Sequence, residues 1–70
     1  MQMTPVSSSN VDSVGYDEST QTLQIKFLNG TVYQYLNVPQ MLFDSLFQAP
    51  SMGSYFNRYI RNQYPYERIG

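Results

Sequence analysis

The chain is 70 residues long, carries a net charge of −1 at neutral pH and contains neither cysteine nor histidine. A chain of this length can form only one hydrophobic core. Because it has no cysteine and no histidine, disulfides and Cys/His zinc sites are excluded. No signal peptide is recognisable, and no apolar stretch approaches the roughly 20 residues that a membrane-spanning helix needs. We expect a single cytoplasmic domain over residues 1–70, with no cofactor, metal or membrane contact.

The small net charge hides an uneven distribution along the chain. Residues 1–50 carry one lysine and four acidic residues, a net of −3, whereas residues 51–70 carry three arginines and one glutamate, a net of +2. Non-specific binding to nucleic acid strengthens with the number of phosphates neutralised, so a total of −1 argues against it. Any anion-binding surface is expected near the C-terminal end.

The first predicted strand covers residues 11–16, where short apolar side chains alternate with small or polar ones. This alternation places Val14 and Tyr16 on the same face of the strand. The Ser-rich residues 1–9 precede it, and Pro5 favours an extended approach.

The next stretch predicts a β-hairpin. Residues 23–28 alternate as a half-buried strand does, and residues 31–36 are rich in β-branched and aromatic side chains. Between them lies Asn29-Gly30, the dipeptide typical of a two-residue type I′ turn.

A two-residue turn fixes which residues face each other across the hairpin. It would place Ile25 opposite Gln34 on a mostly apolar face. The other face would then carry Lys26, Tyr33 and Tyr35, a mixture of cationic and aromatic groups. A slip of one residue would exchange the two faces of one strand.

Two helices are predicted after the hairpin, at residues 39–49 and 51–62. Pro39 suits the first helical position, where its missing N–H costs nothing. Pro50 ends the first helix because proline disfavours helical geometry in the preceding residue, and Ser51 is the natural N-cap of the second. The first helix has an apolar stripe at helical spacing, formed by Leu42, Phe43, Leu46 and Ala49.

The second helix divides into two faces on a helical wheel. Its apolar face contains Met52, Phe56, Tyr59 and Ile60. Its polar face contains Ser54, Asn57, Arg58 and Arg61, and Tyr55 lies on the border. The aromatic, Pro-interrupted tail is expected to pack back as an extended segment. The predicted fold class is α+β, with a small antiparallel sheet of about three strands followed by two helices.

Several short motifs follow one another in a distinctive order. They are Ser8-Ser9-Asn10, Val14-Gly15-Tyr16-Asp17, residues 23–27, Tyr33-Gln34-Tyr35, Val38-Pro39, residues 49–57, Ile60 and Tyr64. Together these motifs resemble the KTSC family, named for a domain at the C-terminus of some lysyl-tRNA synthetases, over about residues 5–66. The resemblance implies a small α+β domain that occurs alone in bacteria and phages or fused to other domains. It also implies a role in RNA binding.

The first candidate binding surface is the sheet face with Lys26, Tyr33 and Tyr35. Exposed tyrosine rings beside a cation can stack single-stranded bases, each stack contributing about 1–3 kcal/mol. The alternative is that the helices cover this face and the tyrosine hydroxyls find local partners.

The second candidate surface is the second helix, with Ser51, Gly53, Ser54, Tyr55, Asn57, Arg58 and Arg61. Free N–H groups in a first helical turn favour anions, and Gly53 permits the close approach of a phosphate. Arg58 and Arg61, three residues apart, could both reach one phosphate. The alternative is an ordinary solvated face, with Gly53 needed for packing against the first helix. For Ser8-Ser9-Asn10, hydrogen bonds that organise the first strand are the preferred interpretation.

The chain lacks the usual groups of a catalytic site. It has no histidine base, no cysteine nucleophile and no Gly-rich phosphate loop, so we expect a protein that is not an enzyme. Two hypotheses about its partner remain open at this point. One is a module that binds tRNA-like or single-stranded RNA, and the other is a protein-interaction module that uses exposed tyrosines as anchors. The sequence does not indicate an oligomeric state.

Overall fold

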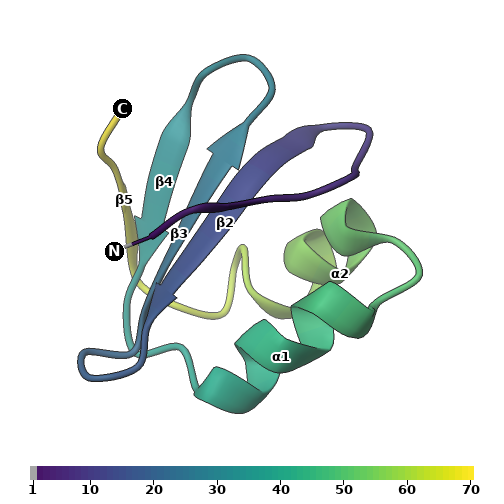
Figure 1. The fold of residues 1–70 in the computed structure, drawn as a ribbon. Helices are drawn as coiled ribbons and strands as arrows, with labels where there is room; N and C mark the ends of the chain where they lie inside the picture. Colours follow the sequence, from purple (N-terminus) through teal and green to yellow (C-terminus); the bar gives the residue numbers. More distant parts are fainter. Residues whose placement is uncertain (1) are drawn as a thin grey trace.

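The computed structural model describes residues 2–70, which form one antiparallel sheet and two helices (Figure 1). The strands pair in their order along the chain, β1-β2-β3-β4-β5. The elements are β1 Thr4–Pro5, β2 Val11–Asp17, β3 Thr22–Phe27, β4 Val32–Tyr35, α1 Gln40–Gln48, α2 Met52–Tyr59 and β5 Tyr66–Arg68. The α+β class is confirmed, and the sheet has five strands rather than about three.

The two additional strands lie at the edges of the sheet. β1 has two residues and β5 has three, too few for an alternating pattern to reveal them in the sequence. β5 forms because the chain after α2 runs back to the open edge of β4, where Tyr66 pairs with Tyr35 (Figure 1). The tail therefore does pack back as an extended segment.

The hairpin between β3 and β4 forms where the sequence predicts it, but its loop has three residues instead of two. The Gly30 N–H donates to the Phe27 carbonyl at 2.9 Å, and the Phe27 N–H donates to the Thr31 carbonyl at 2.9 Å. Gly30 has a φ of 91°, whereas Asn29 does not have a positive φ. This geometry is a type I turn followed by a left-handed residue, a position that glycine fills without steric cost.

The longer loop makes the predicted register wrong by one residue. Leu23 pairs with Tyr35 and Ile25 pairs with Tyr33. Opposite residues of an antiparallel pair lie on the same face, so both tyrosines share the face of the buried Leu23 and Ile25. Lys26 points to the other face, and the predicted surface that combined it with the two tyrosines does not exist.

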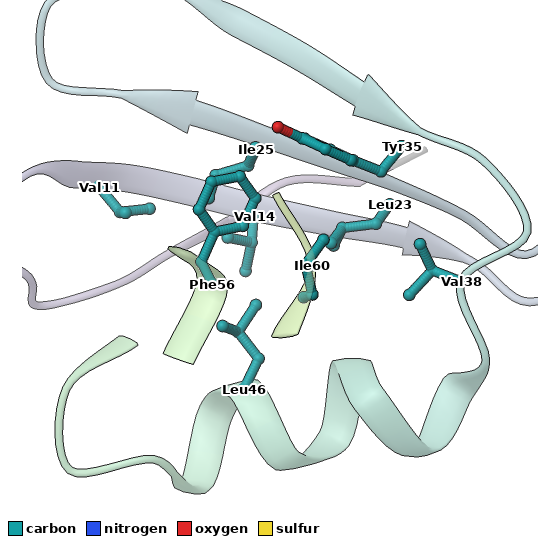
Figure 2. Close-up of a cluster of buried hydrophobic side chains, with 9 residues drawn as sticks. All are labelled: Val11, Val14, Leu23, Ile25, Tyr35, Val38, Leu46, Phe56 and Ile60. Carbon is teal, nitrogen blue, oxygen red and sulfur yellow. The ribbon is translucent and has the colours of Figure 1, made fainter. Parts of the chain in front are cut away.

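The core lies between this sheet face and the helices (Figure 2). Leu46 is the buried residue of α1, and Phe56 is the buried residue of α2. Both point toward the sheet, as does Ile60 just after α2 (Figure 2). Nine hydrophobic residues are buried in total within the described chain: Val11, Val14, Leu23, Ile25, Tyr35, Val38, Leu46, Phe56 and Ile60.

The opposite face of the sheet is polar. The Gln24 amide donates to the Gln34 side chain at 3.2 Å, and the Gln34 amide donates to Glu67 at 3.0 Å. These three residues form a ladder across β3, β4 and β5, beside the exposed Lys26. A sheet with one apolar and one polar face needs cover on one side only, which α1 and α2 provide.

Both helices begin and end within a few residues of the predicted bounds. Pro39 is the N-cap of α1 rather than its first helical residue. Ser51 caps α2 as predicted, because its hydroxyl accepts from the Ser54 N–H at 3.3 Å. α2 ends at Tyr59 rather than near residue 62, and a turn carries Arg61 off the helix end. Within residues 2–70, neither helix is long and apolar enough to cross a membrane.

Candidate functional site

A pocket of about 350 Å³ opens between the sheet and α2, toward the β4–β5 edge. We call it the aromatic pocket. Its lining comes from six parts of the chain: the residue before β2, strands β3, β4 and β5, helix α2 and the turn after α2. The lining residues are Asn10, Phe27, Tyr33, Tyr35, Phe56, Asn57, Arg61, Asn62 and Tyr66.

Five aromatic rings form a continuous wall of this pocket. Tyr66 stacks on Tyr35 with ring centres 5.3 Å apart, and it meets Tyr33 edge-on at 5.9 Å. Phe56 lies edge-on to Tyr35 at 5.2 Å and to Phe27 at 5.8 Å. Tyr35 is only 3% exposed whereas Tyr66 is 58% exposed, so Tyr66 carries the aromatic wall out to solvent.

Amides and a cation complete the lining. Asn10, Asn57 and Asn62 each offer a donor and an acceptor, and the Arg61 guanidinium donates to the Asn57 side chain at 3.4 Å. No carboxylate occurs among the described residues that line the pocket. Arg68 lies opposite Tyr33 on the same sheet face, which adds a second cation at the β5 edge.

The phenol of Tyr35 is neutral at physiological pH. Burial raises its pKa above the ordinary value of 10.0, and the neighbouring Tyr66 and Tyr33 also raise it, whereas the positive charge of Arg61 lowers it. Its hydroxyl therefore keeps its proton and remains a hydrogen-bond donor as well as an acceptor.

Asn10 connects the start of β2 to α2. Its Oδ1 accepts from the Ser8 hydroxyl at 3.3 Å, and its carbonyl accepts from the Leu28 N–H at 3.0 Å. A Cβ on Gly53 would lie 2.8 Å from Asn10 Oδ1, closer than real Cβ contacts. The close neighbour of Gly53 is therefore the Asn10 side chain, rather than the first helix that the sequence suggested.

The structure unites parts of the two surfaces that the sequence treated as separate. Tyr33 and Tyr35 from the sheet meet Asn57 and Arg61 from the second predicted helix in the aromatic pocket. The contact arises because the corrected register turns both tyrosines toward the helices. The alternative was that the helices cover the tyrosines. Tyr35 is indeed buried, and Tyr33 is partly buried.

Other predicted site residues lie elsewhere. Lys26 is exposed on the polar sheet face, and the Ser51 hydroxyl is engaged with Ser54 in the N-cap. The Arg58 guanidinium lies 5.6 Å from the centre of the Tyr59 ring. Arg58 lines a different hollow from Arg61, so the two arginines do not converge on one position.

Tyr55 also faces away from the aromatic pocket. Its ring centre is 4.7 Å from that of Tyr59, and it packs at the margin of the core as its border position suggested. The pocket residues that the sequence reasoning did not single out for binding are Asn10, Phe27, Phe56, Asn62 and Tyr66. For Tyr66 the sequence did contain a signal, because the aromatic tail was expected to pack back against the domain.

These features define a class of protein. It is a small α+β domain with two helices over one face of an antiparallel meander and an aromatic pocket beside them. The family model described as the KTSC domain matches residues 7–64. The chain therefore belongs to the KTSC domain family, as its motifs indicate.

Relatives occur within a larger protein and at similar length. The chain is 41% identical over 54 residues to a lysine–tRNA ligase of Nostoc sp., covering 77% of this chain and 10% of the ligase. It is 37% identical over 70 residues to a protein of Stutzerimonas stutzeri, covering 99% of both. The crystal structure of a KTSC domain protein from Yersinia pestis matches with a TM-score of 0.92 and 38% identity, covering 99% of this chain and 97% of that one. The chain thus spans about a tenth of the ligase it matches.

Proposed function

We propose that this chain is a non-catalytic module that binds single-stranded RNA in the aromatic pocket. The observation that carries the proposal is the meeting of three tyrosines with Arg61 and three asparagines in one pocket whose described lining contains no carboxylate. Stacking surfaces, one cation and neutral amides are the groups that bind bases and a phosphate.

The exposed ring of Tyr66 supports binding of unpaired rather than paired RNA. Every base presents a flat π-face, but in a duplex that face is covered by its neighbours. A pocket of about 350 Å³ is too small to accept a nucleic-acid duplex, whereas a single strand can place one base against its aromatic wall. The amides then offer partners to the base edge, which is also accessible only in unpaired RNA.

The relatives supply a second, independent support. The ligase of Nostoc sp. acts on tRNA by its name, and it carries a stretch similar to this chain. A module with an affinity for unpaired RNA fits that setting. The similarity covers only 10% of the ligase, so the ligase reaction itself forms no part of the proposal.

The expected affinity is modest and depends weakly on salt. Arg61 and Arg68 provide one or two phosphate contacts, and the slope of log K against log salt is about −0.7 per phosphate for single strands. Binding should therefore weaken by only about three- to sevenfold between about 50 and 200 mM salt. A steeper decline would mean that cations other than Arg61 and Arg68 take part.

Fluorescence titration with short single-stranded RNA, and separately with tRNA, tests the proposal. Arg61→Gln is expected to weaken binding by about tenfold, which is typical for the loss of a charge-assisted hydrogen bond. Arg58→Gln is the matched control: it removes the same charge from the same helical region, but Arg58 lines another hollow. Absence of binding at low salt, or an equal loss in both variants, would refute the proposal.

A protein partner is the second candidate function, and the helices carry the observation that favours it. Met41 is 77% exposed, Phe47 is 41% exposed and Tyr59 is 44% exposed. Apolar and aromatic side chains of this kind serve as anchors in protein interfaces. Capture of the same partner before and after nuclease treatment, lost in Met41→Ser, would favour this function over RNA binding.

A further inference from the structure

We infer that the aromatic pocket accepts one unpaired nucleotide in a fixed orientation, with its base at the Asn10 end and its phosphate at the Arg61 end. This inference rests on the proposed RNA-binding function and names the ligand unit and the residue that positions it. A volume of about 350 Å³ lies at the lower end of the roughly 300–1,000 Å³ typical of small-ligand pockets. One nucleotide is the largest part of an RNA chain that suits this volume.

The orientation follows from the spacing of residues along α2. Gly53 and Asn57 lie four residues apart on one side of α2, and Arg61 follows in the turn after the helix, where its guanidinium donates to Asn57. Asn10 lies against Gly53 at one end of this line, and Arg61 lies at the other. α2 has eight residues, about 12 Å of helix, and the two ends of the pocket lie at its first turn and just after its last. The amide end and the cationic end are thus separated as the base and the phosphate of one nucleotide are.

The aromatic wall provides the stacking surface between these ends. One face of Tyr66 lies on Tyr35, and their rings are inclined by only 27°. Tyr66 is 58% exposed, so part of its ring is accessible from solvent. A base bound in the pocket would pack against this aromatic wall.

Asn10 is the residue that we assign to the base edge. The Ser8 hydroxyl donates to its Oδ1, and Gly53 leaves the space in which that oxygen lies. Within residues 2–70 the Nδ2 group of Asn10 donates to no protein acceptor. Its N–H groups are therefore available to an acceptor on the base, in an orientation that Ser8 and Gly53 fix.

Substitutions of Arg61 and Asn10 should affect the affinities for ligands with and without a phosphate differently. We would titrate isotope-labelled protein with each nucleoside and its 5′-monophosphate at low salt and follow amide shifts by NMR. The native chain should bind the monophosphate about tenfold more tightly than the nucleoside. Arg61→Gln should abolish this difference, whereas Asn10→Ala should weaken both ligands and preserve it.

The variant Gly53→Ala tests whether Gly53 positions the Asn10 side chain. Gly53→Ala should displace the Asn10 side chain and weaken binding as much as Asn10→Ala does. In the Asn10→Ala background, Gly53→Ala should have little further effect, since non-additivity reveals residues that act through each other. Additive losses would refute the positioning role of Gly53, with thermal melting used to confirm that each variant is folded.

The outcomes separate this inference from the proposed function. If RNA strands bind with dependence on Arg61 but monophosphates do not shift the pocket resonances, the single-nucleotide inference fails and the RNA-binding function stands. If neither ligand binds, both fail. If monophosphates bind and Asn10→Ala removes the phosphate preference while Arg61→Gln preserves it, the assigned orientation is wrong.

Discussion

Replacing Tyr66 by alanine should affect stability and RNA binding by separately measurable amounts. Tyr66 makes two ring contacts, with Tyr35 at 5.3 Å and Tyr33 at 5.9 Å. Aromatic pairs contribute about 0.5–1.5 kcal/mol each, so the free energy of unfolding should fall by about 1–3 kcal/mol. For a domain of this size that corresponds to a decrease in Tm of roughly 5–25 °C. The total stability, about 4–10 kcal/mol by length, leaves the variant folded at low temperature.

The same substitution removes the proposed stacking surface. Loss of one base stack costs about 1–3 kcal/mol, so affinity for single-stranded RNA should fall about 5- to 150-fold. Tyr66→Phe keeps the ring and removes a hydroxyl that makes no hydrogen bond to the described residues. It should therefore retain both the Tm and the affinity. Circular dichroism melting and fluorescence titration, performed on the same samples, measure the two effects.

The comparison between the two variants decides the role of Tyr66. If Tyr66→Ala melts earlier as expected but binds RNA as tightly as the native chain, Tyr66 supports the fold and is not a stacking surface. If Tyr66→Phe loses as much affinity as Tyr66→Ala, the hydroxyl and not the ring is what RNA contacts. Either result would refute the reasoning from ring geometry.

Three further predictions concern the fold. Leu46→Ala, at the fully buried residue of α1, should lower the free energy of unfolding by about 2–5 kcal/mol in urea titrations, whereas the exposed Met41→Ala should change it by less than about 0.5 kcal/mol. Gly30→Ala should lower the free energy of unfolding by about 1–2 kcal/mol because φ at this position is 91°. Gly30→Asn should lower it by less, since asparagine tolerates this region better. Equal losses in the two variants would contradict the strain argument. Because burial raises the pKa of Tyr35 above 10.0, the folded state favours the neutral phenol, so its stabilising effect is complete below pH 10 and declines as the pH rises above it. Tyr35→Phe should therefore show a shallower loss of stability above about pH 10, and an unchanged slope would argue against this group.

Local patterns in the sequence were sufficient for most of the secondary structure. The alternation in β3, the apolar stripe that includes Leu46 and the Ser51 cap each depend on residues close together in the chain, and each is present in the structure. The edge strands could not be predicted in the same way. β5 has three exposed residues, and it is a strand only because the β4 edge is available to it.

The hairpin illustrates how a small local error changes the predicted site. Asn29-Gly30 correctly marks the turn, but the dipeptide is compatible with a two-residue or a three-residue loop. The sign of φ at Asn29 differs between the two loops, and the length of the loop decides whether Tyr33 and Tyr35 face Lys26 or the helices. The residues of the site were therefore partly predictable from their chemistry, whereas their grouping required the register.

The fold also explains why no single motif reveals the aromatic pocket. Asn10 precedes the second strand, Arg61 follows the last helix and Tyr66 opens the last strand. Asn10 is far from the other two in sequence, and Tyr66 joins the pocket only when β5 pairs with β4. Spacing along the chain carries no signal for such a contact, because long-range packing alone creates it.

The position of Tyr66 on the short outermost strand has a consequence for dynamics. All three residues of β5 are exposed, and such edge segments open locally at a lower free energy than the core does. Each opening removes one wall of the aromatic pocket, so the affinity for the proposed ligand should equal the intrinsic affinity multiplied by the closed fraction. A ligand that binds only the closed form should in turn slow amide hydrogen exchange in β5 while leaving β2 and β3 unchanged. Local opening of β5 would then limit how tightly the pocket holds the proposed ligand.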